Sequence, residues 1–224
     1  MNKAKIKELL SETSWSDTQY SKNGIESQYY TTHNKKLNRP LIIKHTLISD
    51  DIEKPNPEEE THHGQEFALE AFLLPNDKSS PEYVGMVHYF MYTQSSLGNP
   101  PYGYVMQFRV EPELNSVKTQ EMGIGTLLLD TVKSHMTQNS LNHFKLHMWP
   151  DPRCYDKNSP LTPLEQLQVI YENMGMKKDK ETKRKMHIDL PVQDYKTFEE
   201  LGLEAITPTL TSSAEPQLTC PQEP

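Results

Sequence analysis

A glycine-containing turn, Gln120-Glu121-Met122-Gly123-Ile124-Gly125, carries the clearest chemical signal in the chain. Its two glycines lack Cβ, so the backbone there can turn sharply or approach a ligand closely. A helix begins within the turn, and its first N–H groups have no intrahelical acceptor. Those donors and the positive end of the helix dipole favour an anion. The turn therefore predicts a phosphate cradle, although a short glycine turn on its own more often just connects two elements.

Metal and thiol chemistry are weakly represented. His62 and His63 are adjacent, but without a third ligand they do not predict a metal site. The two cysteines, Cys154 and Cys220, form neither a disulfide framework nor a Cys-based metal site. No apolar run approaches the roughly 20 residues of a membrane span, and no long apolar region follows the basic N-terminus. We therefore expect a reduced, cytoplasmic protein with no membrane partner and no bound metal.

The charge is concentrated in two segments. Residues 50–60 and residues 191–224 each carry a net charge of −5, so the rest of the 224-residue chain has a net charge of +2. The near-neutral body argues against nucleic-acid binding, and the lysine-rich stretch 177–185 is interrupted by acids, as in a solvated hairpin. We expect an N-terminal helix and polar lead-in (1–39), one folded domain (40–190) and an acidic Pro/Thr/Ser-rich tail (191–224), disordered at its end.

The elements that position the turn begin with a series of strands. Residues 41–48, 66–74, 83–93 and 102–110 are β-prone runs, with a bulge expected at Gly85, and the acidic stretch to Gly64 is expected to be a loop. Short turns between consecutive runs predict an antiparallel meander. In the last run, Tyr104, Met106, Phe108 and Val110 alternate with Val105, Gln107 and Arg109, which predicts two opposite faces.

Helical patterns follow the turn. Ile124, Leu127, Leu128, Val132 and Met136 mark one apolar helix face, and residues 144–148 alternate as the next strand. A second helix is predicted from Thr162, whose Thr-x-x-Glu spacing forms a capping box, to Gly175, with an apolar stripe that includes Ile170 and Tyr171. Residues 176–178 and 185–190 predict a closing hairpin, and residues 198–203 a helical turn.

This order of elements, together with two motifs, resembles the GCN5-related N-acetyltransferase family over residues 40–190. The Gln-x-x-Gly-x-Gly motif is met by Gln120, Gly123 and Gly125, and the Tyr-Glu-x-x-Gly motif by Tyr171, Glu172 and Gly175. The resemblance implies an α+β fold, a mixed α/β sandwich whose mostly antiparallel sheet is flanked by helices and whose fourth and fifth strands splay apart. It also implies transfer of an acetyl group from acetyl-CoA to a primary amine by direct attack.

The resemblance also assigns roles along the strand and the turn. It implies that the backbone of Phe108, Arg109 and Val110 binds the pantetheine arm, and that the turn binds the pyrophosphate through Gln120, Glu121, Met122, Gly123, Ile124, Gly125 and Thr126. Tyr171 matches the tyrosine that many members use to protonate the leaving thiolate, although on an apolar stripe it is equally a core residue. For the general base Glu111 and His147 are candidates, and Tyr104 is a candidate for positioning a water.

Two departures from the family pattern keep other functions open. The segment between Val110 and Gln120 is long, and the segment 149–155, rich in Trp, Tyr and Pro, is an insertion that we expect to line the acceptor site. A catalytically silent acetyl-CoA sensor and an interaction module with acidic contacts both remain alternatives. Cys154 has no paired base and does not predict a covalent relay. The acceptor amine and the oligomeric state are not determined by the sequence.

Overall fold

The computed structural model describes residues 26–32, 39–55, 61–74, 81–111, 113–114, 117–118, 122–148, 157–179, 182, 184–190 and 195–206. Two α-helices lie in these ranges, α3 (Ile124–Gln138) and α4 (Pro163–Asn173). The strands are β1 (Glu26–Thr32), β2 (Leu41–Pro55), β3 (Thr61–Leu73), β4 (Glu82–Ser95), β5 (Tyr102–Val110), β6 (Glu113–Leu114), β7 (Val117–Lys118), β8 (His143–His147), β9 (Lys177–Lys178), β10 (Lys185–Asp189) and β11 (Leu203–Ile206).

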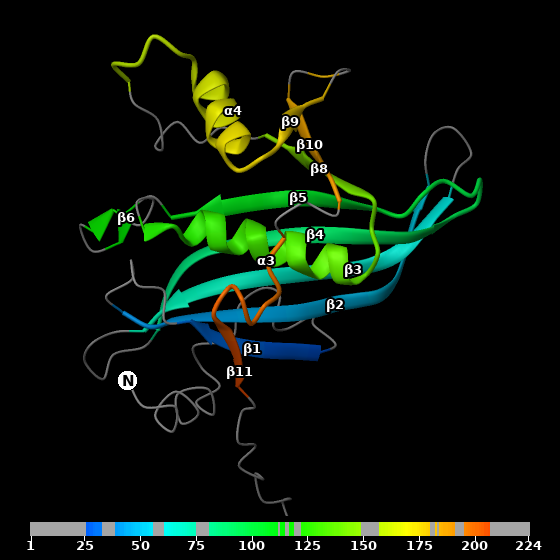
Figure 1. Cartoon of the computed structure of the whole chain (residues 1–224), viewed down its shortest axis with the longest axis horizontal. Coiled ribbons are helices and arrows are strands. Elements are labelled where there is room, and N and C mark those ends of the chain that lie inside the picture. The colour runs from blue at the N-terminus through cyan, green and yellow to red at the C-terminus, as the bar shows by residue number, and fades with distance from the viewer. Residues whose placement is uncertain are drawn as a thin grey trace, which may run out of the picture.

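The described strands form one large mixed sheet and one small ladder. The large sheet has nine strands in the order β11-β1-β2-β3-β4-β5-β8-β10-β9, and β6 pairs with β7 separately (Figure 1). Strands β2 to β5 form the expected antiparallel meander, whereas β5 and β8 are parallel and are connected through α3. The general α+β class is therefore confirmed.

Helix α3 covers one face of the sheet, in front of β3 to β5 in Figure 1. Ile124, Leu128, Val132 and Met136 recur every four residues and are each fully buried, which confirms the expected apolar face. At Gly103 of β5, an added Cβ would overlap the Met136 sulfur. The sequence thus provides both an apolar stripe on the helix and a strand position without a side chain where Met136 packs against the sheet.

The acidic stretch before Gly64 is not simply a loop, contrary to expectation. β2 continues to Pro55 and β3 begins at Thr61, so most of the stretch belongs to a long hairpin. Asp50, Asp51 and Glu53 are exposed on it. The backbone N–H and C=O groups of the two strands pair with each other while the carboxylates remain in water. The acidic composition therefore did not prevent strand formation.

The sheet extends beyond the limits expected for the domain near residues 40 and 190. β1 pairs with β2 on one side and with β11 on the other. The turn expected over residues 198–203 forms at Phe198–Gly202, and the chain then enters β11. The expected N-terminal helix and the end of the tail fall in parts of the chain outside the described residues.

Helix α4 has the ends that the sequence predicts. Thr162 accepts a hydrogen bond from the backbone N–H of Glu165, whose side chain accepts one from the backbone N–H of Thr162 in return, and Gly175 follows the helix with a φ of +86°. The strands β9 and β10 form the expected closing hairpin. The predicted apolar stripe is only partly correct, because Ile170 is 43% exposed while Tyr171 is buried. The helix therefore contacts the rest of the protein along a narrow side.

Candidate functional site

The central feature is the place where β5 and β8 stop pairing. The parallel register runs from Tyr102 opposite His143 to Val105 opposite Leu146, although β5 continues to Val110. The chain after β8 stays with β10 instead, since the Met148 N–H donates to the Arg184 carbonyl over 2.8 Å. Among the described strands, none pairs with Met106–Val110 on the side away from β4. We call Met106–Val110 the diverging segment of β5.

A β-bulge lies at the start of the diverging segment. On β4, His88 is opposite Gln107 and Tyr89 is opposite Val105, which leaves Met106 as the extra residue on β5. A bulge bends its strand and increases the local twist. The bulge also changes the alternation that was expected along residues 102–110. Val105 and Phe108 share the face covered by α3, whereas Tyr104 and Arg109 lie on the opposite face. The expected bulge at Gly85 lies one residue away, at Val84.

The glycine turn places the start of α3 next to the diverging segment. Gly123 precedes the helix with a φ of +74° and a ψ of +13°, a left-handed conformation that glycine adopts without strain. The first bond of the helix runs from the Leu127 N–H to the Gly123 carbonyl over 3.0 Å. The N–H groups of Ile124, Gly125 and Thr126 therefore precede the hydrogen-bond ladder, and the first turn has no acidic residue. This geometry suits an anion.

The residues of the glycine turn that are expected to bind a cofactor lie in different surroundings. Gly125 faces β5, because an added Cβ would lie 3.4 Å from Val110 Cγ2 and 3.5 Å from Phe108 Cζ. Met122 and Ile124 face the core, while Thr126 is exposed and Gly123 borders open space. Gln120 and Glu121 lie outside the described residues, as does the 149–155 insertion.

Tyr171 lies against the diverging segment. Its side chain is 5% exposed, and its ring centroid is 6.0 Å from that of Phe108. α4 thus brings Tyr171 to the same strand residue that α3 approaches through Gly125. The sequence placed the tyrosine and the glycine turn on separate helices, and the fold brings both helices to one end of β5.

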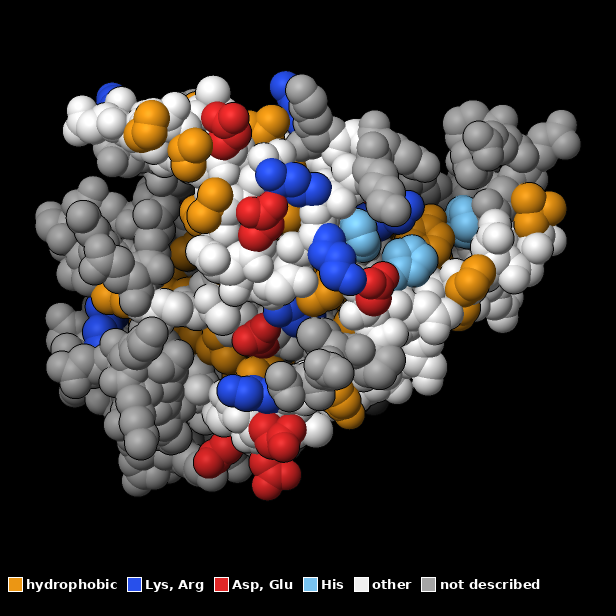
Figure 2. All heavy atoms as spheres, turned by 45° about the horizontal axis from the view of Figure 1, so that its top comes forward, with side chains coloured by type: hydrophobic (Ala, Val, Ile, Leu, Met, Phe, Trp, Pro, Cys, Tyr) orange, Lys and Arg blue, Asp and Glu red, His pale blue; other side chains and the backbone are white. Residues whose placement is uncertain are grey.

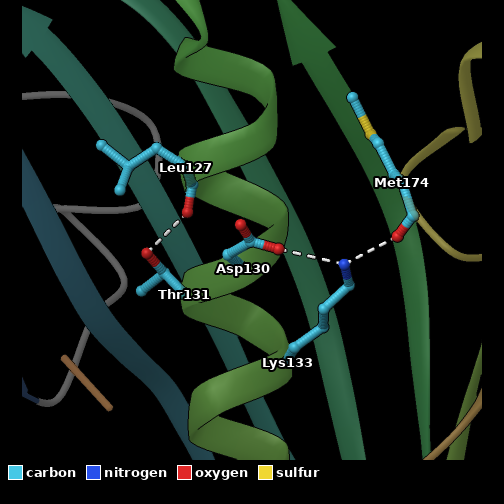
Figure 3. A network of polar contacts seen from close by, with 5 residues as sticks. All are labelled: Leu127, Asp130, Thr131, Lys133 and Met174. Atoms are coloured by element: carbon cyan, nitrogen blue, oxygen red, sulfur yellow. Dashed lines mark hydrogen bonds and ion pairs between the residues drawn. The ribbon is translucent and has the colours of Figure 1, made fainter. Parts of the chain in front are cut away.

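A lysine fixes α4 to α3. Lys133, near the middle of α3, donates to the carbonyl of Met174 over 2.8 Å and pairs with the carboxylate of Asp130 at 3.0 Å (Figure 3). In the same view Thr131 donates to the carbonyl of Leu127 over 2.8 Å. Met174 caps the C-terminal end of α4, where carbonyl groups lack intrahelical donors. Since Tyr171 lies less than one turn earlier, the lysine also limits where Tyr171 can lie.

Glu111 and Arg109 form an ion pair at the end of β5. The Arg109 guanidinium lies 2.8 Å from the Glu111 carboxylate, and the Glu111 N–H donates to the Val84 carbonyl over 2.9 Å. Alternation along the strand puts both side chains on the face opposite Phe108 and Val110. Glu111 is therefore separated from Tyr171 by the backbone of β5.

His147 ends β8 and lies opposite Lys185 of β10. Burial lowers its pKa, and the neighbouring charges of Lys185 and Arg184 lower it further. The imidazole is thus neutral at pH 7, as a base must be. On the surface turned forward in Figure 2, histidine side chains lie among basic (Lys or Arg) and acidic side chains. The register of the same two strands also places His143 opposite Asp189.

The sequence reasoning missed one pair of acid–base residues. His88 of β4 lies 2.6 Å from the carboxylate of Glu66 of β3, Nε2 to Oε1. The two residues are 22 positions apart, and both lie on the sheet face opposite α3. Side-chain alternation puts each of the two residues on the outward-facing side of its strand. It shows that they meet only once the register between β3 and β4 is known.

The described residues contain no cluster of three or more His, Cys, Asp or Glu side chains suited to a metal ion. Their helices include none that is long and apolar enough to span a membrane. Both cysteines lie outside the described residues.

Comparisons with known proteins give a partial likeness of fold. No family model matches the chain, and no curated protein matches its sequence. A structure described as the NatC complex bound to Gag peptide and CoA is similar over 54% of this chain and 70% of its own, with 16% identity and a TM-score of 0.37. A KacTA–DNA complex is similar over 55% and 67%, with 14% identity and a TM-score of 0.36. Likenesses this distant establish no family and no activity for the chain.

Proposed function

We propose that the protein is an acetyl-CoA-dependent N-acetyltransferase that transfers the acetyl group to a primary amine. One observation carries the proposal: the diverging segment of β5 leads, through the glycine turn, to the N-terminus of α3. A strand whose pairing ends offers backbone donors and acceptors to an extended ligand arm, and the helix N-terminus offers donors to phosphates. An extended arm that ends in a pyrophosphate is the chemistry of coenzyme A.

The proposed binding residues follow that order. The backbone of Phe108, Arg109 and Val110 would bind the pantetheine arm, and the turn from Gln120 to Thr126 would bind the pyrophosphate. The α3 end meets this need because its first turn holds no acid that would repel an anion. The bend at Met106 turns the diverging segment out of the β8 ladder, which leaves this stretch of backbone to a ligand.

The proposed chemistry needs few protein groups. The thioester must be oriented, its amine partner must lose a proton, and the thiolate that leaves must gain one. Tyr171 is proposed as the proton donor to the thiolate, because it lies against Phe108 on the strand that would hold the cofactor arm. Glu111 and His147 are the proposed candidates for the general base.

The binding test is a calorimetric titration of acetyl-CoA into two matched variants, Gly123→Asn and Gly123→Asp. Asparagine and aspartate both tolerate the left-handed conformation and have similar size, and the site borders open space. Only aspartate brings a negative charge to the helix N-terminus, where it would compete with the pyrophosphate. We expect the Asp variant to bind acetyl-CoA at least about tenfold more weakly than the Asn variant, corresponding to about 1.4 kcal/mol.

Equal affinity in both variants would exclude the glycine turn as the phosphate site. If no form binds acetyl-CoA, the proposed function itself fails. For the chemical step, Tyr171→Phe should lower kcat while the dissociation constant of acetyl-CoA stays within about twofold, because the ring remains against Phe108 and only the proton donor is lost. A wild-type rate in that variant would remove Tyr171 from the mechanism.

A further inference from the structure

Glu66 and His88 form a pair on the sheet face opposite α3. Tyr89, the neighbour of His88, points toward α3 and contacts His135 there, so His88 points to the other side. The side chains of His88 and Glu66 are 12% and 22% exposed. The pair is therefore held largely within the protein while a part of it reaches the surface.

The hydrogen bond fixes the chemistry of the imidazole. An ionised carboxylate only accepts hydrogen bonds, so His88 Nε2 must carry the proton that it shares with Glu66 over 2.6 Å. In the neutral ring Nδ1 then has the lone pair. A histidine whose tautomer and orientation are fixed by a carboxylate is the arrangement of a general base.

Aromatic residues lie beside the pair on the same face of the sheet. Phe90 lies 5.1 Å from the His88 ring, and Tyr104 is opposite Phe90 on β5. Burial raises the pKa of Tyr92 well above its usual value, and the nearby Tyr102, Tyr104 and Glu66 contribute to the rise. The wall is thus neutral and aromatic, with one carboxylate. Rings with their negative faces, together with a carboxylate, suit an alkylammonium group.

The pair lies level with the start of the diverging segment. His88 is opposite Gln107, the residue after the bulge. The next residue, Phe108, faces the other side of the sheet and contacts Tyr171. An amine near His88 and a thiol near Tyr171 would therefore approach the same stretch of β5 from its two faces.

We propose that Glu66 and His88 bind the acceptor as an alkylammonium and that His88 Nδ1 removes its proton; this rests on the proposed acetyl transfer. The ammonium gives one proton to His88, which passes it to solvent. The amine nitrogen then forms a bond to the acetyl carbon, and the carbon–sulfur bond breaks. The nitrogen then loses its second proton, and Tyr171 regains a proton in place of the one that it gives to the thiolate. The products are an N-acetylated amine, free CoA and one proton.

The charged neighbours on this face agree with that assignment. Arg109 is paired with Glu111 at 2.8 Å, and Lys145 lies on β8 opposite Tyr104, on the far side of Tyr104 from His88. Lys44 of β2 and Glu70 of β3, which lie opposite each other on the same face, are both buried.

The first experiment detects the amine without turnover. Histidine Cε1–Hε1 signals are recorded by NMR during titration with 1,5-diaminopentane, with 1,5-pentanediol as a neutral probe of the same length. The His88 signal, assigned by its loss in His88→Gln, is expected to shift with the diamine and not with the diol. The signal of the exposed His63, assigned through His63→Gln, should stay in place. An unmoved His88 signal at saturating acetyl-CoA would overturn the amine site.

The second experiment measures turnover by release of the CoA thiol from acetyl-CoA and 1,5-diaminopentane. We expect His88→Gln to lose about 10²- to 10⁴-fold in kcat and the rising acid limb of the pH profile, with unchanged acetyl-CoA affinity. Glu66→Gln should lose less, and His63→Gln nothing. Wild-type kcat in His88→Gln, or loss of the acid limb in His147→Gln or Glu111→Gln instead, would overturn the base assignment. A diamine-shifted His88 signal without acetyl-CoA binding would overturn only the acetyl transfer.

Discussion

The stability of the protein should fall steeply between pH 6.5 and pH 4 because of a buried His–Tyr–His network. The Tyr89 hydroxyl lies 2.8 Å from His45 Nε2 and 2.8 Å from His135 Nδ1. A hydroxyl donates one proton, so one imidazole accepts from it and the other donates to it. The rings of the two histidines lie 4.6 Å apart between the sheet and α3.

Burial sets the sign of the effect. It lowers the pKa of His135 from 6.5 to about 4, and it lowers the pKa of His45, which the neighbouring His135 lowers further. Between pH 6.5 and 4 the unfolded chain therefore binds more protons than the folded one, and stability decreases as the pH falls. The shift of His135 corresponds to about 3 kcal/mol, with a slope of up to about 1.4 kcal/mol per pH unit.

The assay is urea unfolding at several pH values between 7 and 4, on the wild type and on His135→Asn. Asparagine retains a polar group near the position of Nδ1 but takes no proton. The free energy of unfolding of the variant should depend less on pH, by up to about 1.4 kcal/mol per unit. His63→Gln, at an exposed position, serves as the control with an unchanged slope. Equal slopes for wild type and His135→Asn would refute the reasoning.

Three further substitutions test the packing around the candidate site, each by urea unfolding. Lys133→Met keeps the aliphatic stem but loses the charged donor to the Met174 carbonyl, and should cost about 1.5–3 kcal/mol, whereas an unchanged midpoint would show that α4 is held by other contacts. Thr162→Ala should cost about 1 kcal/mol through loss of the capping box, and Thr162→Ser should restore it. Gly103→Ala should cost about 1–3 kcal/mol because its Cβ would meet Met136, and a stable variant would mean that the sulfur moves aside.

Local patterns determined several elements correctly. The alternation over residues 102–110 gave β5 with its observed ends, and the four-residue spacing from Ile124 to Met136 gave the buried face of α3. Thr162 and the Thr-x-x-Glu spacing to Glu165 gave the start of α4. Each of these signals depends on residues within one or two turns of each other, so the local chain suffices to encode them.

Other features were misread because composition is a weak guide to backbone pairing. The acids before Gly64 indicated a loop, yet the hairpin of β2 and β3 forms there because its ladder uses backbone groups that are independent of side-chain charge. The strand β11 was not expected in an acidic segment, and it exists because β1 provides a partner edge.

The sequence by itself thus determined several elements, among them β5, α3 and α4, and the glycine turn that could hold an anion, because these follow from neighbouring residues. Tertiary structure decided the bulge at Met106, since a bulge is defined only by the register between two strands. It also decided which side chains meet. Glu66 and His88 come from adjacent strands, and Tyr171 reaches Phe108 through the packing of α4. Contacts between residues distant in sequence depend on strand order and register, which a single sequence does not specify locally.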